Sequence, residues 1–273
     1  MTLLNRSIAW AVSLIVTICA VASPSHAEDA HCLFRCPTGD AESNIRLERT
    51  LYTAGYNVQT KFSDWVAYVV AKETLGDNKD RRFAADPDIA SDDGLEPTDF
   101  EGAFGNNLKY EIGHQAPLNS LGDGKNWKEL NYLSNVTPQK ESVNSGVWRA
   151  LESWEEKLIR VKGFTEVYVI TGPLYLQAMK QMPHADEDHI VPSGYWKVLA
   201  VEEVEGFVFG AFIIPQSHKA GTKKICDYGR VSSIDEIELA SGLDIFSGLP
   251  SSDEADVEEV KGGELLGIIG CDG

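Results

Sequence analysis

The chain has 273 residues, 43% of them hydrophobic and 24% charged, and its formal net charge at pH 7 is −18. This length is enough for one large domain with a sizeable core. The strongly acidic balance argues against a typical nucleic-acid binder, which carries a basic surface.

Residues 1–27 have the pattern of a secretory signal peptide. Arg6 provides a basic start, an apolar run extends from Ile8 to Ala22, and small residues occupy the −3 and −1 positions of a cleavage site that ends at Ala27. An uncleaved membrane anchor is the alternative, but the run is shorter than a comfortable bilayer span. We therefore expect residues 28–273 to form a single soluble domain, secreted or periplasmic, with no membrane partner.

Four cysteines follow the predicted cleavage site, namely Cys32, Cys36, Cys226 and Cys271. An even number in an exported chain predicts two disulfides. Four cysteines allow three connectivities, and the simplest pairs Cys32 with Cys36 and Cys226 with Cys271. A structural zinc site is the alternative for the first pair, but no second Cys or His pair has a matching spacing.

The N-terminal half alternates between polar stretches and one apolar stretch. Residues 28–60 are expected to be polar and turn-rich, and the aromatic and β-branched residues of Lys61–Lys72 predict a strand. Leu75–Glu101 is expected to be a long loop. Its acidic residues superficially suggest calcium, but they lack the ligand spacing and central glycine of a calcium loop, so we expect a solvated loop.

The centre of the chain contains the predicted helix of greatest interest. Lys109–Pro117 is expected to be a strand end and turn, and Ser134–Gln139 an irregular polar segment. From about Ser142, a three-to-four residue spacing predicts one helical face. The residues of this face are Asn144, Trp148, Leu151, Glu152, Glu155 and Ile159. Asn144 and Glu152 are therefore expected on the same side of the helix.

The C-terminal half is predicted to contain most of the sheet. Glu166–Thr171 is expected to be a strand that ends in a Gly172-Pro173 turn, and Tyr195–Val204 and Gly206–Pro215 two strands around a tight turn. Ser233 opens a capping box and a short helix that stops near Gly242. The chain as a whole reads as one α+β domain.

The central stretch has residue types suited to phosphodiester hydrolysis. That reaction needs a base for water and a cation that neutralises charge on the phosphoryl oxygens. His114 has a suitable pKa for the base, and Asn144 with Glu152 offers the oxygen ligands that Mg²⁺ prefers. A lone histidine is more often structural and a helical glutamate more often solvated, so these residue types alone are not specific. A second metal site at His184–His189 is also conceivable, but an acidic surface loop is expected there.

These residues belong to an ordered series of motifs. The series comprises CPTG at 36–39, KFSDWVAY at 61–68, GHQAPLNSL at 113–121, LNYLSNVTPQK at 130–140, Asn-x-Gly-x-Trp at 144–148, ITGPLY at 170–175 and PSGYWKV at 192–198. In this order they resemble the DNA/RNA non-specific endonuclease family, and within it the secreted, sugar-non-specific nucleases of the Serratia type. The resemblance covers essentially residues 28–273, which are therefore expected to form a single nuclease domain.

The resemblance implies a fold, a reaction and a set of roles. The fold is α+β, with a mixed, largely antiparallel central sheet flanked by helices and a ββα-metal active-site core. The reaction is Mg²⁺-dependent cleavage of DNA and RNA that leaves 5′-phosphate ends, with Mn²⁺ as a possible substitute. The resemblance implies that His114 is the general base, that Asn144 is the direct metal ligand and that Glu152 orients a metal-bound water. It also implies that Arg81, with Arg82 as the fallback, binds the phosphate. Asn135 is expected to take part in catalysis, and Glu111 and Asn131 are expected to support the site. The family pattern also agrees with the Cys32–Cys36 and Cys226–Cys271 pairs, and a homodimer is conceivable.

Two positions depart from the family pattern. Ile112 and Glu156 stand where the family has arginines, so substrate affinity and preference are in question. The alternative is accordingly a catalytically impaired, nuclease-like extracellular protein that only binds nucleic acid or a partner. A secreted phosphatase is a weaker alternative, because no phosphatase nucleophile motif is present. Basic residues of the central stretch are expected to make the active face locally positive despite the acidic chain.

Overall fold

The computed structural model describes residues 29–76, 80–105, 107–122, 125–219, 225–228, 231–250, 257–261 and 263–271. The predicted signal peptide lies outside these residues, as does most of Ser251–Lys261. Within the described part of the chain, no helix is long and apolar enough to cross a membrane.

A seven-stranded sheet forms the centre of the domain, in the order β1-β2-β3-β6-β7-β8-β9, with every neighbouring pair antiparallel. Its strands are β1 (Ile45–Glu48), β2 (Thr53–Asn57), β3 (Phe62–Ala71), β6 (Glu166–Leu174), β7 (Gly194–Glu203), β8 (Gly206–Pro215) and β9 (Val231–Ser232). Four of the seven strands are nine or ten residues long and rich in β-branched and aromatic side chains, which suit a pleated, buried surface.

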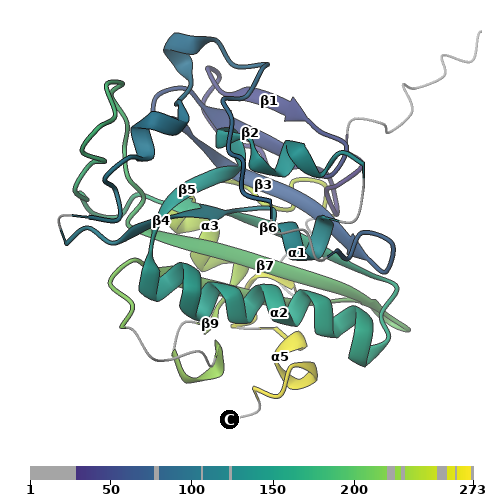
Figure 1. The fold of residues 1–273 in the computed structure, drawn as a ribbon. Helices are drawn as coiled ribbons and strands as arrows, with labels where there is room; N and C mark the ends of the chain where they lie inside the picture. Colours follow the sequence, from purple (N-terminus) through teal and green to yellow (C-terminus); the bar gives the residue numbers. More distant parts are fainter. Residues whose placement is uncertain are drawn as a thin grey trace, which may run out of the picture.

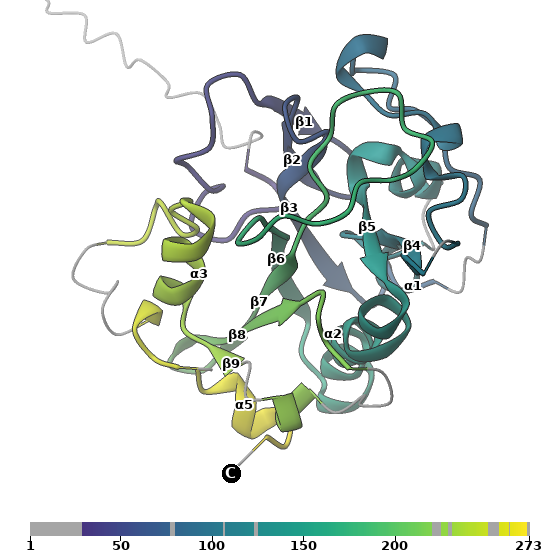
Figure 2. The same ribbon diagram turned by 90° about the vertical axis from the view of Figure 1, so that its left-hand side faces the viewer.

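Both faces of this sheet are covered (Figures 1 and 2). One face packs against the helices α1 (Leu118–Leu121) and α2 (Arg149–Lys157), around the fully buried side chains of Trp148 and Tyr195. The opposite face packs against α3 (Ile234–Ser241) and the N-terminal segment, around Trp65 and Trp196. The short helix α5 (Leu265–Ile268) lies against β8. The predicted α+β class with a largely antiparallel, helix-flanked sheet is confirmed.

A separate two-stranded ribbon positions the site. It pairs β4 (Tyr110–His114) with β5 (Val136–Lys140) in antiparallel register, and His114 faces Val136 across the ribbon. A helical run then leads from the irregular turn Val143–Trp148 through α2 to a last turn, Leu158–Lys162, which ends at Gly163. Gly146 interrupts the helical backbone within this run. Ribbon and helix together form a ββα unit on one face of the large sheet.

Short 3-10 helices also occur in the described part of the chain. They are Ser91–Asp93, Pro97–Phe100, Trp127–Asn131, Leu133–Asn135 and Ile225–Tyr228. A third hydrophobic cluster, which includes Phe62, Phe100 and Tyr110, packs the turn Pro97–Phe100 against β3 and the ribbon.

Several sequence predictions are confirmed. The hairpin β7–β8, the helix from about Ser142, and the helix that follows Ser233 all form, the last with a complete capping box and a left-handed Gly242. Both expected disulfides, Cys32–Cys36 and Cys226–Cys271, are present. The second pair ties the C-terminal segment to the turn that follows β8.

Three predictions of irregular structure are wrong. Residues 28–60 contain β1 and β2, and Ser134–Gln139 includes most of β5. β6 continues through Gly172 and Pro173 to Leu174 without a turn. A Cβ atom at Gly172 would lie 2.1 Å from the backbone oxygen of Asp64, so this glycine marks a close approach within the sheet and not a turn.

The acidic loop is also less solvated than expected. Asp86 is buried, pairs with Arg49, and accepts a hydrogen bond of 2.5 Å from the hydroxyl of Ser134. Asp88 and Asp92 are exposed, as predicted. A buried carboxylate needs such partners, and here they fasten the loop to the segment that precedes β5.

Candidate active site

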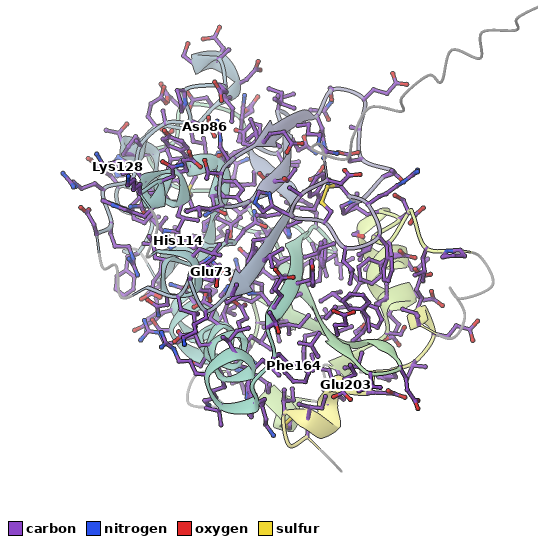
Figure 3. The ribbon with its side chains drawn as sticks, turned by 90° about the vertical axis from the view of Figure 1, so that its right-hand side faces the viewer. Glu73, Asp86, His114, Lys128, Phe164 and Glu203 are labelled. Carbon is purple, nitrogen blue, oxygen red and sulfur yellow. A yellow bond between two sulfur atoms is a disulfide. The ribbon has the colours of Figure 1, made fainter. Side chains whose placement is uncertain are left out.

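A polar cavity of about 100 Å³ lies between the β4–β5 ribbon and the central helical run. It is lined by Arg81, Ile112, His114, Pro117, Leu118, Asn119, Asn144, Arg149 and Glu152. The structure therefore brings together four of the residues predicted for the site, from the loop before β4, from β4 and from the helix. His114 and Lys128 lie on the same flank of the molecule, away from Phe164 and Glu203 (Figure 3). Arg82 does not line the cavity and pairs with Asp80 instead, which favours Arg81 over its fallback.

Two hydrogen bonds of Asn131 define the tautomer of His114. Its Nε2 lies 3.0 Å from Oδ1 of Asn131, whose own Nδ2 donates to the backbone carbonyl of Asp80 at 2.9 Å. Because that second bond fixes the orientation of the amide, Oδ1 accepts and Nε2 of His114 carries the proton. The lone pair of the neutral ring is then on Nδ1.

His114 is held from several sides. Its side chain is buried, its ring lies 5.4 Å from the ring of Phe83, and its backbone carbonyl accepts a 3.3 Å hydrogen bond from the indole of Trp148. Burial lowers the pKa of His114 to about 4; the hydrogen bond to Asn131 opposes this shift and the charge of Arg81 adds to it. The imidazole is therefore neutral near pH 7.

The amide of Asn144 is oriented by an acid on the neighbouring strand. Oε2 of Glu111 accepts hydrogen bonds from Nδ2 of Asn144 and from the hydroxyl of Ser145, both at 2.9 Å. With Nδ2 committed, Oδ1 of Asn144 is the atom suited to meet a cation. Glu111 does not line the cavity itself, so the structure places it as a support for Asn144.

Glu152 faces the same cavity from α2 and is partly buried. Burial raises its pKa to about 7; the charge of Lys197 opposes the rise, Glu155 adds to it, and Arg149 and Arg81 oppose it more weakly. A bound divalent cation would favour the ionised carboxylate.

Behind Glu152, a buried ionic network anchors α2 to the sheet. The ammonium of Lys197 on β7 and the carboxylate of Glu155 are fully buried and 2.6 Å apart. Glu155 also accepts hydrogen bonds from the hydroxyls of Tyr68, at 3.0 Å, and Ser120, at 2.8 Å. Lys197 lies 4.6 Å from the ring centroid of Trp148, the residue whose indole holds the carbonyl of His114. The network therefore connects β3, β7 and α1 to the helix that carries Glu152.

Asn135 lies beneath the site and does not line the cavity. Its Oδ1 accepts from the backbone N–H of Ala116, and its Nδ2 donates to the carbonyls of Ala116 and Leu130, each at 2.9 Å. The side chain is fully buried, and its amide is committed to the backbone. The structure thus gives Asn135 a scaffolding position and gives Asn131 the contact with His114.

The donor set suits a hard divalent cation. Asn144 and Glu152 present amide and carboxylate oxygens to one polar cavity, and hard divalent cations prefer oxygen ligands. Metal ligands are commonly held in place by a hydrogen bond from a residue behind them. Glu111 has this position, because it orients the amide of Asn144.

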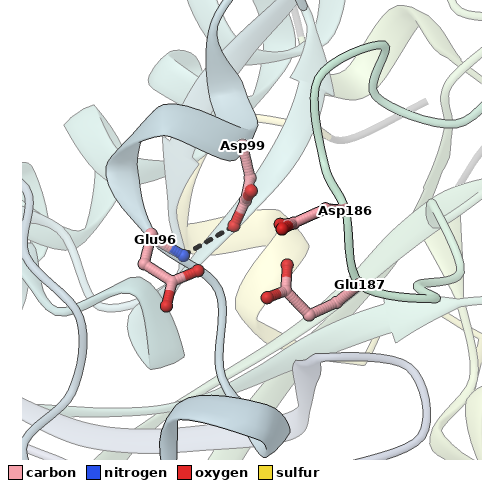
Figure 4. A group of neighbouring side chains, drawn as sticks. All are labelled: Glu96, Asp99, Asp186 and Glu187. Carbon is pink, nitrogen blue, oxygen red and sulfur yellow. Dashed lines mark hydrogen bonds between the residues drawn. The ribbon is translucent and has the colours of Figure 1, made fainter.

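A second group of carboxylates, formed by Glu96, Asp99, Asp186 and Glu187, has ligand atoms that all lie within 4.8 Å of one another (Figure 4). It includes two residues of the His184–His189 segment but neither histidine. His189 is buried and accepts a hydrogen bond from the backbone of Met182, while His184 is exposed. We assign this acidic cluster no role in the reaction.

Arg149 is one of the basic residues of the central stretch that are expected on the active face. It lines the cavity and lies three residues before Glu152 on the helix. The buried ion pair is a feature that the sequence did not reveal. Lys197 lies in the buried stretch 194–201 of β7, and a lysine there needs a buried acid, which Glu155 of α2 supplies.

Comparisons with known proteins agree with this geometry. A family model described as DNA/RNA non-specific endonuclease matches residues 32–252. "Nuclease" of Serratia marcescens is 41% identical over 242 residues, covering 88% of this chain and 89% of the relative, and "Nuclease C1" of Cunninghamella echinulata var. echinulata is 30% identical over 226 residues, covering 77% and 86%. A solved structure, "Crystal structure of the EndoG/EndoGI complex: Mechanism of EndoG inhibition", shares the fold with a TM-score of 0.64 at 22% identity, covering 78% of this chain and 89% of that chain.

Proposed function

This chain belongs to the DNA/RNA non-specific endonuclease family, whose members are metal-dependent nucleases, and we propose that it is exported and cleaves DNA and RNA with little sequence preference. The proposed cofactor is Mg²⁺, with Mn²⁺ as a substitute, and the proposed products have 5′-phosphate ends. The observation that carries this proposal is the cavity in which a neutral His114, an oriented Asn144 and the carboxylate of Glu152 face one another.

His114 acts as the general base. Its Nε2–H is held by Asn131, so Nδ1 takes the proton from the attacking water. The lowered pKa of His114 keeps the ring neutral near pH 7, so that the base is available without prior deprotonation. Asn131 is accordingly a positioning residue.

The charge of the phosphate is met from two sides. The guanidinium of Arg81 faces the cavity and suits the oxygens of a phosphodiester. Oδ1 of Asn144 would hold the cation directly and Glu152 would hold it through water, and the bound ion would stabilise the charge that develops on the phosphoryl oxygens.

Export and assembly are further parts of the proposal. The signal-peptide pattern of residues 1–27 and the two disulfides support a secreted or periplasmic location. A homodimer is proposed only as an expectation of the family resemblance, and sedimentation of the purified protein would test it.

The test is cleavage of plasmid DNA and of RNA by the purified protein with Mg²⁺ and with EDTA. We expect cleavage that EDTA abolishes, products with 5′-phosphates, and a loss of about 10²- to 10⁴-fold in His114→Ala. His184→Ala, which changes an exposed histidine outside the cavity, is the matched control and should retain activity. Binding without cleavage would favour the impaired, binding-only alternative, and full activity of His114→Ala would refute the proposed base.

A further inference from the structure

Few side chains of the cavity can meet a negative charge. Ile112 lines the cavity with an apolar side chain, and Glu156 does not line it. Glu156 lies 3.8 Å from the guanidinium of Arg160, one turn further along the helix, so the two charges pair on the helix surface. Arg81 alone would then have to hold an anionic substrate in a chain whose formal net charge is −18.

Arg149 contributes a second positive side chain to this cavity, from the helix α2. It is the first residue of α2, it is exposed, and it lines the cavity together with Arg81, Asn144 and Glu152. Positions three residues apart on a helix are surface neighbours, with about 5–6 Å between their Cβ atoms, so Arg149 stands beside Glu152 at the rim.

The electrostatics of the rim favour an anion between the two arginines. Burial lowers the pKa of Arg81, the charge of Glu152 opposes the shift, and the positive charge of Arg149 adds to it. The guanidinium groups of Arg81 and Arg149 are therefore close enough to repel each other, and both line the same small cavity. A phosphodiester between them converts this repulsion into two charge-assisted contacts.

The other basic residues of the central stretch do not share this position. The ammonium of Lys140 lies 4.2 Å from the ring centroid of Tyr110, that of Lys109 lies 3.5 Å from Glu141, and that of Lys157 lies 4.7 Å from the ring centroid of Trp154. Among the described residues that line the cavity, Arg81 and Arg149 are the ones with a positive side chain. The positive charge of the cavity lining is thus supplied by these two arginines.

We infer that Arg149 binds a non-bridging oxygen of the substrate phosphate together with Arg81, the other cation that lines the cavity. This assignment rests on the proposed function and specifies how its substrate is held. The planar guanidinium makes paired hydrogen bonds to a phosphate that a lysine ammonium cannot reproduce. Arg149 is therefore a substrate-binding residue and is not needed for the fold.

The test compares wild type, Arg149→Ala, Arg149→Lys and Lys162→Ala on one labelled DNA duplex. Lys162 is an exposed cation at the far end of the helical run, about 20 Å along the helix axis from Arg149, so its loss changes the net charge equally without touching the cavity. Two readouts are needed. One is kcat/KM with Mg²⁺, and the other is binding by fluorescence anisotropy in EDTA over about 50 to 200 mM sodium chloride.

We expect Arg149→Ala to lower kcat/KM by about 10- to 100-fold, and Arg149→Lys to lie between it and wild type. The slope of log binding constant against log salt should become shallower by about 0.9 in Arg149→Ala, the value for one phosphate contact, and stay unchanged in Lys162→Ala. Activity of Arg149→Ala within twofold of wild type would overturn the inference, as would a loss of activity with an unchanged salt slope. If wild type bound the duplex but did not cleave it, the proposed function would fail, and the salt slope would still decide the role of Arg149.

Discussion

Removal of the buried ammonium of Lys197 should destabilise the domain severely. In Lys197→Met, the carboxylate of Glu155 would remain fully buried and would retain only the hydroxyls of Tyr68 and Ser120 as partners. Breaking a buried ion pair from one side costs about 3–5 kcal/mol, because the remaining charge has no compensation. For a domain of this size that corresponds to a fall in Tm on the order of 10 °C.

The double variant Lys197→Met/Glu155→Leu separates this effect from the loss of packing. Removing both charges leaves no buried ion, so most of the lost stability should return. Lys157→Met is the matched control, because Lys157 is an exposed lysine of α2, the helix that carries Glu155. This substitution should change the free energy of unfolding by less than about 0.5 kcal/mol.

Urea unfolding followed by tryptophan fluorescence measures these differences, with the disulfides kept intact. The coupling energy from the four-variant cycle should be favourable and amount to several kcal/mol. A cost below about 1 kcal/mol for Lys197→Met, or a double variant no more stable than additivity predicts, would refute the view that this pair anchors α2.

Three further predictions concern the site. Asn131→Ala should reduce kcat on the order of 100-fold with little change in KM, because the tautomer of His114 is no longer fixed; a change in KM alone would contradict this role. Glu111→Gln should raise the Mg²⁺ concentration for half-maximal activity by about 10- to 100-fold, because Asn144 loses its orienting acceptor, and an unchanged requirement would count against it. Since burial lowers the pKa of His114 to about 4 and raises that of Glu152 to about 7, the base is active above pH 4 and Glu152 loses its charge below pH 7. Activity should therefore fall at acid pH because Glu152 becomes protonated, and the midpoint of this fall should move to lower pH as the Mg²⁺ concentration is raised. A midpoint near pH 6.5 that does not depend on the Mg²⁺ concentration would indicate an unperturbed histidine instead.

The sequence identified elements whose signal is local. The capping box at Ser233, the tight turn between β7 and β8, and the apolar run of β3 each form from short-range preferences. The short strands β1 and β5 lack such a signal. β5 contains Pro138 and polar residues and exists because it pairs with β4, a contact between segments more than twenty residues apart.

The motifs predict four residues that the structure brings together in one cavity, but they do not predict the contacts among the side chains around them. Ordered motifs identified His114, Asn144, Glu152 and Arg81, and the structure places all four in one cavity. Motifs do not show which amide reaches the imidazole. The structure gives that contact to Asn131 and commits the amide of Asn135 to the backbone. Motifs also do not show whether another residue supplies the charge that is missing at Ile112 and Glu156. Arg149 becomes a candidate only when the three-dimensional structure places it in the cavity.

The most direct test of the site is a crystal structure of the protein with Mn²⁺, located by anomalous scattering. We predict one ion in the cavity, bound directly by Oδ1 of Asn144, with water as its other ligands and Glu152 hydrogen-bonded to one of those waters. An ion held instead by Glu96, Asp99, Asp186 and Glu187, with none at Asn144, would contradict the assignment of the active site.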